Sequence, residues 1–353
     1  MDARGAPSVT VFWRMISGGF LMRHNRAYIL NSFYCGVMVL LRAFALATAE
    51  NLTSDTQTEQ STTAAQKIAA FCAKVDQKYR TLNWGPSPCA KLPWQFDMES
   101  EKGQPLIYID FDFNSPNKFD KIKGTETTLI LGGVHPDEIT PIHLVFKFAQ
   151  ELAENPSLYA NRRVVVAPLV NPDAFLSNSG KRTNARGVDL NRNFPTKDWA
   201  ERALKYWRQS RKSNPRHFPG FAAQSEKETQ FQIKLLEQFE PDKIISVHAP
   251  LGFLDYDGPG DSKHMNLTPL EKKARDLANV ISRNANNYQV RDYNFYPGSL
   301  GNYSGNERNI PTLTLELKSS DPRKVHAFWK EFSPGLKAAV SYEFRKKSVA
   351  QSK

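Results

Sequence analysis

The sequence predicts an α/β fold: a mixed, mostly parallel sheet with helices on both faces. From Leu106 onward, short apolar runs rich in β-branched residues alternate with longer segments whose apolar residues recur at helical spacing. Chains that alternate in this way form mostly parallel sheets covered by helices on both sides. With 353 residues, of which 40% are hydrophobic and 24% charged, the chain has room for one large domain.

The pattern places the individual elements of this fold. A helix is expected to begin at Ser225-Glu226-Lys227-Glu228, which has the form of a capping box. Apolar residues at helical spacing follow it, Phe231, Leu235, Leu236 and Phe239. The remaining segments are strands predicted at Thr128–Gly133, Val164–Val170, Lys243–Val247 and Pro311–Leu317, and helices predicted at Ile139–Glu154 and Pro269–Arg283.

Residues 1–49 have the pattern of a secretory signal peptide. Arg23 and Arg26 provide the positive start, an apolar run extends from Phe33 to Leu41, and residues 47–49 read Ala-Thr-Ala, a small-residue cleavage site. The sequence therefore predicts a protein that is secreted or periplasmic.

Two features qualify this signal segment. Met22 is a more natural start than Met1, so residues 1–21 are interpreted as an extended start. The alternative to cleavage is an uncleaved membrane anchor, which would be the protein's one membrane contact. The apolar run is short for a membrane span and Arg42 follows it directly, which favours export over anchoring.

The next two segments precede the main domain. Residues 50–63 are rich in Ser, Thr and Gln and are expected to form a flexible spacer. Residues 64–104 begin with helical spacing and contain Cys72 and Cys89, the two cysteines that survive removal of the signal. In an oxidising compartment they are expected to form one disulfide, and the alternative is a pair of buried free thiols.

The chain is basic, with a net charge of +11. Five arginines and one aspartate lie in residues 1–49, so the rest carries +7, including a basic tail at 346–353. This excess suits an anionic polymer such as a cell wall, and it equally describes a solvated exterior. No basic-aromatic nucleic-acid motif is present, and no nucleic-acid partner is expected.

The stretch from Asn184 to Pro195 (Asn-Ala-Arg-Gly-Val-Asp-Leu-Asn-Arg-Asn-Phe-Pro) is too polar for a buried strand and reads as irregular backbone. Its two arginines, Arg186 and Arg192, suit a site that binds an anion, because the planar guanidinium can hold a carboxylate with two hydrogen bonds. A surface loop with solvated arginines is the alternative.

Metal-binding and acid–base side chains accompany three of the predicted strands. His135 and Glu138 follow the first strand, His248 follows the third, and Glu316 lies in the last. Ligand sites in parallel sheets lie beyond the carboxyl ends of the strands, where His135 and His248 fall. A single histidine at such a place is more often a packing residue, and Glu316 could instead pair with Lys318 at a solvated edge.

Together these motifs resemble the zinc carboxypeptidases of the M14 family, which carry His-x-x-Glu, an Asn-Arg pair, a later His and a final catalytic Glu. Within that family the chain is most similar to the branch of the murein peptide amidases. The resemblance implies a zinc carboxypeptidase-like catalytic domain over residues 105–345.

The resemblance also implies roles for individual residues. His135, Glu138 and His248 would bind one zinc ion per chain. Glu316 would be the general base, and Arg182 the cation that stabilises the oxyanion. Two further residues, Asn191 and Arg192, would hold the free carboxylate of the substrate. The other histidines, His24, His143, His217, His264 and His326, match no family motif and receive no catalytic role.

The segment Tyr296–Tyr303 resembles the part of these enzymes that selects the terminal residue. Leu300 is apolar, which disfavours a simple lysine- or arginine-selective pocket. A mobile tyrosine acts in many members, and Tyr293 and Tyr296 are both candidates. Asp255 and Asp257 lie in a segment similar to the murein-amidase branch, where they could bind the amino group of a diaminopimelate-type side chain or form a solvated turn.

The leading hypothesis is a secreted zinc peptidase that cleaves peptidoglycan stem peptides. The first alternative is a carboxypeptidase that acts on ordinary protein C-termini, and the second is an inactive wall-binding module. The last is disfavoured because His135, Glu138, His248 and Glu316 are all present. The position of the cleaved bond within a stem peptide stays open.

Overall fold

The structure is a computed structural model that describes residues 63–112, 125–178, 180–260, 267–293 and 295–344. The chain divides into two compact units, residues 1–61 and 62–353, and every described residue belongs to the second. The predicted signal segment, nearly all of the spacer and the basic tail therefore lie outside the described residues. Within the described part, no helix has the length and apolar character needed to cross a membrane.

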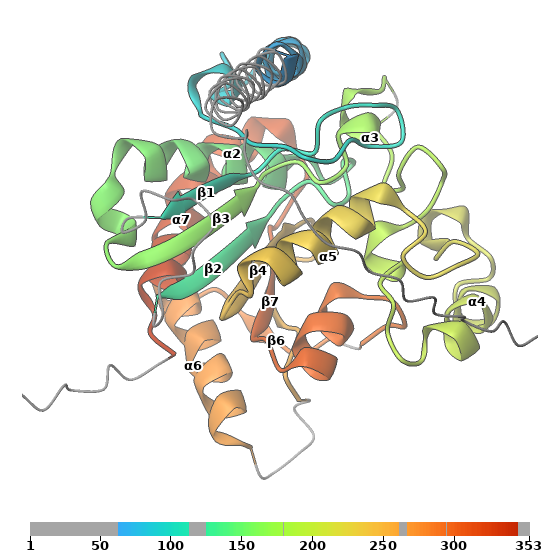
Figure 1. Cartoon of the computed structure of the whole chain (residues 1–353). Coiled ribbons are helices and arrows are strands. Elements are labelled where there is room, and N and C mark those ends of the chain that lie inside the picture. The colour runs from blue at the N-terminus through green and yellow to red at the C-terminus, as the bar shows by residue number, and fades with distance from the viewer. Residues whose placement is uncertain (1–62, 113–124, 179, 261–266, 294, 345–353) are drawn as a thin grey trace, which may run out of the picture. The chain divides into compact units, whose positions relative to one another are not determined.

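A seven-stranded sheet forms the centre of the second unit, in the order β1-β3-β2-β4-β7-β5-β6 (Figure 1). The four strands β3, β2, β4 and β7 pair in parallel, whereas β1 and β5 pair antiparallel to β3 and β7. The strands are β1 (Ile109–Asp112), β2 (Glu126–Leu131), β3 (Arg162–Ala167), β4 (Lys243–His248), β5 (Leu254–Tyr256), β6 (Val290–Arg291) and β7 (Thr312–Glu316). The predicted mixed, mostly parallel sheet is confirmed.

Helices cover both faces of this sheet. One face carries α2, α6, α7 and the N-terminal helix (residues 63–81), and α5 packs on the other (Figure 1). The helices are α2 (Ile139–Glu154), α3 (Pro172–Leu176), α4 (Trp199–Ser210), α5 (Lys227–Phe239), α6 (Pro269–Asn284) and α7 (Val325–Ser341).

The central strand β2 shows why both faces must be covered. All six of its residues are buried. Ile130 belongs to the core cluster that contains α2 and α7, while Leu129 and Leu131 belong to the cluster that contains α5. Side chains alternate between the faces of a strand, so an uninterrupted apolar run requires an apolar layer on each side.

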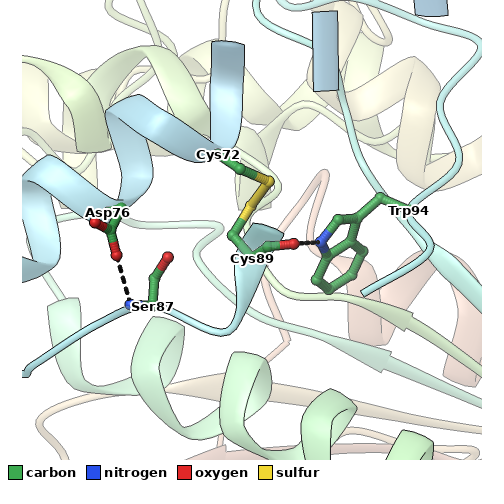
Figure 2. The surroundings of a disulfide bond; sticks show 5 residues. All are labelled: Cys72, Asp76, Ser87, Cys89 and Trp94. Carbon is green, nitrogen blue, oxygen red and sulfur yellow. Dashed lines mark hydrogen bonds between the residues drawn. A yellow bond between two sulfur atoms is a disulfide. The ribbon is translucent and has the colours of Figure 1, made fainter. Parts of the chain in front are cut away.

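A disulfide joins Cys72 in the N-terminal helix to Cys89, as predicted (Figure 2). The segment around it is held by further contacts: the Trp94 indole nitrogen donates to the Cys89 carbonyl oxygen at 2.7 Å, and the Ser87 backbone N–H donates to Asp76 at 2.8 Å. A cross-link over 17 residues restricts the unfolded chain and contributes about 3 kcal/mol to stability in the chain-entropy model.

Most predicted elements agree with the structure, and α2 has the predicted bounds. The predicted capping box at Ser225 is wrong. The N-cap of α5 is Glu226, without a side-chain cap, and the Ser225 hydroxyl donates to the Glu226 carboxylate instead. The Glu226 carboxylate also accepts from Asn184, so this polar cluster takes the place of the cap. A complete capping box is found at Thr268 and Glu271, at the start of α6.

The parallel strands bring the candidate residues to one edge. His248 is the last residue of β4, Glu316 is the last of β7, and the two are in register. His135 lies four residues beyond the end of β2, and Glu138 is the N-cap of α2. All four therefore gather at the carboxyl edge of the sheet, where ligands bind in this class of fold.

Candidate active site

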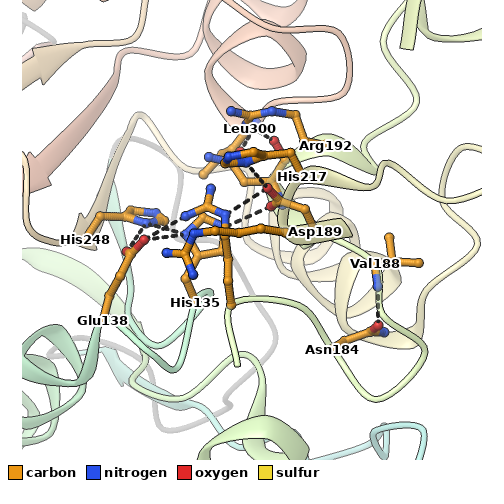
Figure 3. A network of polar contacts seen from close by, with 12 residues as sticks. His135, Glu138, Asn184, Val188, Asp189, Arg192, His217, His248 and Leu300 are labelled. Atoms are coloured by element: carbon orange, nitrogen blue, oxygen red, sulfur yellow. Dashed lines mark hydrogen bonds and ion pairs between the residues drawn. The ribbon is translucent and has the colours of Figure 1, made fainter. Parts of the chain in front are cut away.

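His135, Glu138 and His248 form a compact group at this edge. Their candidate ligand atoms all lie within 4.8 Å of one another, and all three residues are buried. The Glu138 carboxylate oxygens lie 3.2 Å from Nδ1 of His135 and 3.0 Å from Nδ1 of His248, and the two Nδ1 atoms are 3.1 Å apart. Figure 3 shows the three side chains pointing toward one another.

Neighbouring side chains orient both imidazoles. Asp189 is fully buried and accepts a hydrogen bond at 2.9 Å from Nε2 of His135. With Nε2 turned toward Asp189, the ring presents its Nδ1 to Glu138 and His248. The Ser246 hydroxyl lies 2.9 Å from Nε2 of His248 and is hydrogen-bonded to it.

Two imidazole nitrogens and a carboxylate that converge on one point are the donor set of a catalytic zinc site, and histidine ligands are commonly oriented by such outer partners. The charges around the group fit this role. Burial acts to raise the pKa of the Glu138 carboxyl, but the adjacent His135 and His248 outweigh burial and hold that pKa well below its usual range. These contacts favour the ionised form of Glu138, and the three residues present fit a divalent cation.

Arg182 lies against this group. Its Nη1 donates to Glu138 at 2.7 Å and its Nε donates to Asp189 at 2.9 Å. Burial opposes the charge on both Arg182 and Asp189, yet their attraction keeps the pKa of the Asp189 carboxyl well below normal. The structure thus places a fixed guanidinium beside the predicted ligands.

Glu316 faces the same cavity, which has a volume of about 260 Å³. Burial raises the pKa of the Glu316 carboxyl to about 7, while His248 lowers it and Glu138 adds to the rise. The Leu251 backbone N–H donates to its Oε2 at 3.3 Å. A carboxyl group with a pKa near neutrality can exchange protons efficiently as a general base.

Asn191 and Arg192 line the cavity as well. The Asn191 side-chain oxygen accepts from the Leu300 backbone N–H at 2.7 Å, and the Arg192 guanidinium lies 4.2 Å from the centre of the Tyr296 ring. The backbone of Arg192 packs closely against Gly298: a Cβ atom at position 298 would lie 2.0 Å from the Arg192 carbonyl oxygen, so only glycine fits there. Burial lowers the pKa of Arg192.

Asp255 lies in β5 and is buried, Asp257 follows β5 and is half-buried, and both line the cavity. Burial raises the pKa of both carboxyl groups, and in Asp255 the neighbouring Asp257 raises it further. The Tyr293 backbone N–H donates to Asp255 at 2.8 Å, and the Thr314 hydroxyl donates to Asp257.

Two predictions about the cavity need correction. Leu300 does not line it: its side chain is buried in the core cluster on the α5 face, and the neighbouring Ser299 lines the cavity instead. His217, which matches no family motif, lines the cavity and lies 3.7 Å from Asp189. Both tyrosine candidates, Tyr293 and Tyr296, also line it.

Sequence reasoning missed the residues that act through others. Asp189 lies in the Asn184–Pro195 stretch, so a carboxylate two residues before the Asn-Arg pair was the available signal. Ser246 precedes His248 by two residues on the same strand face, which gives a weaker signal. Arg211, which directly follows α4, also lines the cavity, and it matches no sequence motif.

Comparison with known proteins identifies the family of this chain. The family model for zinc carboxypeptidase, Peptidase_M14, matches residues 97–336. Murein peptide amidase A from Vibrio campbellii is 32% identical over 62% of this chain and 77% of the relative, and its namesake from Escherichia coli K12 is 33% identical over 61% and 77%.

Solved structures give the same fold. Carboxypeptidase A from Helicoverpa armigera is 18% identical, covers 80% of each chain and has a TM-score of 0.55, a likeness that concerns the fold alone. The sequence-based recognition is confirmed by the match over residues 97–336, which contains all the candidate site residues. The chain is a hydrolase that belongs to the zinc carboxypeptidase family.

Proposed function

We propose that this protein is an exported zinc peptidase that cleaves peptidoglycan stem peptides beside a terminal residue with a free carboxylate. The observation that carries the proposal is one cavity that joins a His-Glu-His group, the Glu316 carboxyl and the Arg192 guanidinium. One zinc ion per chain would be held by His135, Glu138 and His248.

The residues divide the chemistry between them. When bound, zinc supplies Lewis acidity toward the scissile carbonyl and a water of lowered pKa. Glu316 accepts the proton of the attacking water and passes it to the leaving amine, and its raised pKa of about 7 suits this exchange near neutral pH. Arg182 stabilises the negative charge that develops on the carbonyl oxygen, and Asn191 and Arg192 hold the terminal carboxylate.

Two observations support a stem peptide as the substrate. The two relatives reported above are murein peptide amidases, at 32% and 33% identity. In addition, buried Asp255 and half-buried Asp257 both line the cavity, and their two carboxyl groups suit an amino group on the substrate's side chain. An ordinary apolar C-terminal residue would leave that pair without a charged partner, at a cost in binding.

Export is part of the proposal. The basic and apolar segments of residues 1–49, the Ala-Thr-Ala site and the Cys72–Cys89 disulfide all suit an oxidising compartment outside the cytoplasm. Peptidoglycan lies in the same compartment.

Digestion of defined muropeptides tests the substrate. The purified protein with zinc should release the terminal residue, or a peptide that begins with it, from a stem tripeptide, and the product masses identify the bond that is cleaved. Peptides with ordinary protein C-termini serve as the comparison, and their preferred hydrolysis would contradict the proposal.

The carboxylate contact of Arg192 is testable separately. We expect Arg192→Ala to lower kcat/KM by roughly 10- to 100-fold, because a charge-assisted contact is lost. Arg192→Lys should rescue little, since a point charge cannot copy the two-pronged guanidinium. Arg202→Ala, which removes an exposed arginine of α4, is the matched control and should change kcat/KM little.

Amidation of the substrate's terminal carboxylate sharpens this test. The amidated peptide should be poor for the wild type, and Arg192→Ala should lower its kcat/KM only slightly more, because the same contact is removed twice. Independent, multiplying losses would show that Arg192 does not bind this carboxylate.

A further inference from the structure

The cavity contains two cations that have no carboxylate partner among the described residues. Four arginines line it. Arg182 is paired with Glu138 and Asp189, and Arg216 is paired with Asp137. No described carboxylate lies within ion-pair distance of the other two, Arg192 and Arg211.

Arg211 is held in place by aromatic rings. It directly follows α4, and its guanidinium lies 5.7 Å from the centre of the Tyr206 ring and 5.1 Å from the centre of the Tyr296 ring. Those two rings pack on each other at 5.5 Å. The Arg211 Nε is buried and has no hydrogen-bond partner in the described structure. Buried N–H groups in proteins are normally hydrogen-bonded, so this one suits an acceptor on a bound ligand.

Arg192 and Arg211 share this environment. Both guanidiniums lie against the Tyr296 ring, and the Arg192 Nε is likewise buried without a partner. The two like charges repel each other, and Arg211 adds to the effect of burial in lowering the pKa of Arg192. Two anionic groups on a ligand would relieve this repulsion and satisfy both buried N–H groups.

Two carboxyl groups in the cavity, those of Asp255 and Asp257 (the acidic pair), lack a cationic partner among the described residues. Asp255 is buried and Asp257 is half-buried, both line the same cavity, and no described Lys or Arg lies within ion-pair distance of either. Asp255 lies close to Tyr293, which neighbours the Tyr296 ring that contacts Arg211. It accepts a hydrogen bond from the Tyr293 backbone N–H, and the centres of the Tyr293 and Tyr296 rings are 6.2 Å apart. Carboxyl groups that lack a counter-ion in a cavity suit a cationic group on the ligand.

We propose that Arg211 binds a second carboxylate, on the side chain of the substrate's terminal residue, and that Asp255 and Asp257 bind the amino group of that side chain. Arg192 then binds the main-chain carboxylate. The ligand is a terminal diamino dicarboxylic acid, whose three charged groups match the three unpaired features of the cavity. The inference rests on the proposed function, because it names the residues that select the terminal residue of the stem peptide.

Simpler terminal residues do not match these charges. A neutral amino acid provides one carboxylate and leaves Arg211 and the acidic pair without partners. Lysine adds an amino group for Asp255 and Asp257 but still leaves Arg211 unpaired. The second carboxylate is therefore the group that distinguishes the proposed substrate, and Arg211 is its specificity residue.

The test compares three tripeptides that share an acyl part and end in meso-diaminopimelate, in its side-chain carboxamide, or in lysine. We expect the wild type with zinc to prefer the first by roughly 10- to 100-fold in kcat/KM, the usual effect of one charge-assisted contact. Arg211→Met keeps the aliphatic stem and removes the charge. It should lose activity on the diacid peptide alone, so the preference collapses.

Two further variants complete the design. Arg208→Met removes an exposed arginine in the last turn of the same helix, outside the cavity, and should keep the preference. Arg211→Lys keeps a charge without the planar fork and should retain part of the preference, which separates loss of the contact from loss of the fold.

Each outcome decides the inference. Equal losses on the diacid and carboxamide peptides in Arg211→Met would overturn it, as would a wild type that cleaves all three peptides equally well; in both cases the proposed function stands. If no tripeptide is cleaved, the proposed function fails. Calorimetry with free meso-diaminopimelate and free lysine then decides whether the Arg211 subsite exists. Tighter binding of the diacid that disappears in Arg211→Met supports the subsite, and equal or absent binding refutes it.

Discussion

Replacing Glu316 with glutamine is expected to lower kcat by roughly 10²- to 10⁴-fold while zinc stays bound. Glutamine keeps the shape of the side chain and can still accept from the Leu251 N–H, but it cannot take up a proton. His135, Glu138 and His248 are unchanged, so metal content measured by mass spectrometry should equal that of the wild type. Steady-state kinetics on the same preparation measures the loss.

The pH profile provides an independent readout. Burial raises the pKa of Glu316 to about 7, and a bound dication nearby can only lower it. We therefore expect the wild-type kcat/KM to fall tenfold per pH unit below an apparent pKa at or under about 7, and this acid limb should be absent in Glu316→Gln. Glu331→Gln, the same change at a surface ion pair with Lys318, is the control. An unchanged profile in Glu316→Gln would assign the base to another residue.

Replacing His248 with alanine is expected to abolish hydrolysis and release most of the zinc. Catalytic zinc sites use three protein ligands, and this change leaves His135 and Glu138 alone. It also removes a neighbour that holds the Glu138 carboxylate ionised. Metal content after dialysis should fall well below one ion per chain, and added zinc should restore little activity.

The control is His326→Ala, an exposed histidine in α7 that does not line the cavity. It should retain metal and activity. Because His248 lies at the end of a strand, its replacement should leave the fold intact, and the circular dichroism spectra of both variants should match that of the wild type. Full zinc occupancy with activity retained in His248→Ala would remove this residue from the ligand set.

The fold was predictable where local pattern and burial agree. The strands β2, β3, β4 and β7 are buried almost throughout, and their sequences are dominated by apolar residues and threonine. Helix α2 has a clear helical period. Elements with weaker signals were missed: β1, β5 and β6 are short or half-buried, and α7 contains Pro334. The capping box at Ser225 failed because Asn184, 42 residues away, binds the Glu226 carboxylate.

The sequence by itself determined the fold class, the family, the zinc-ligand candidates His135, Glu138 and His248, and the candidate base Glu316. Short motifs carry these features, because residues a few positions apart at strand ends are placed by local backbone geometry. Only the tertiary structure decided which side chains share the cavity. It buried Leu300 in the core, joined Asp189 to His135, and brought Arg211 from the end of α4 to the Tyr296 ring that packs on Arg192. Such contacts depend on how distant segments pack, and no spacing within one segment encodes them.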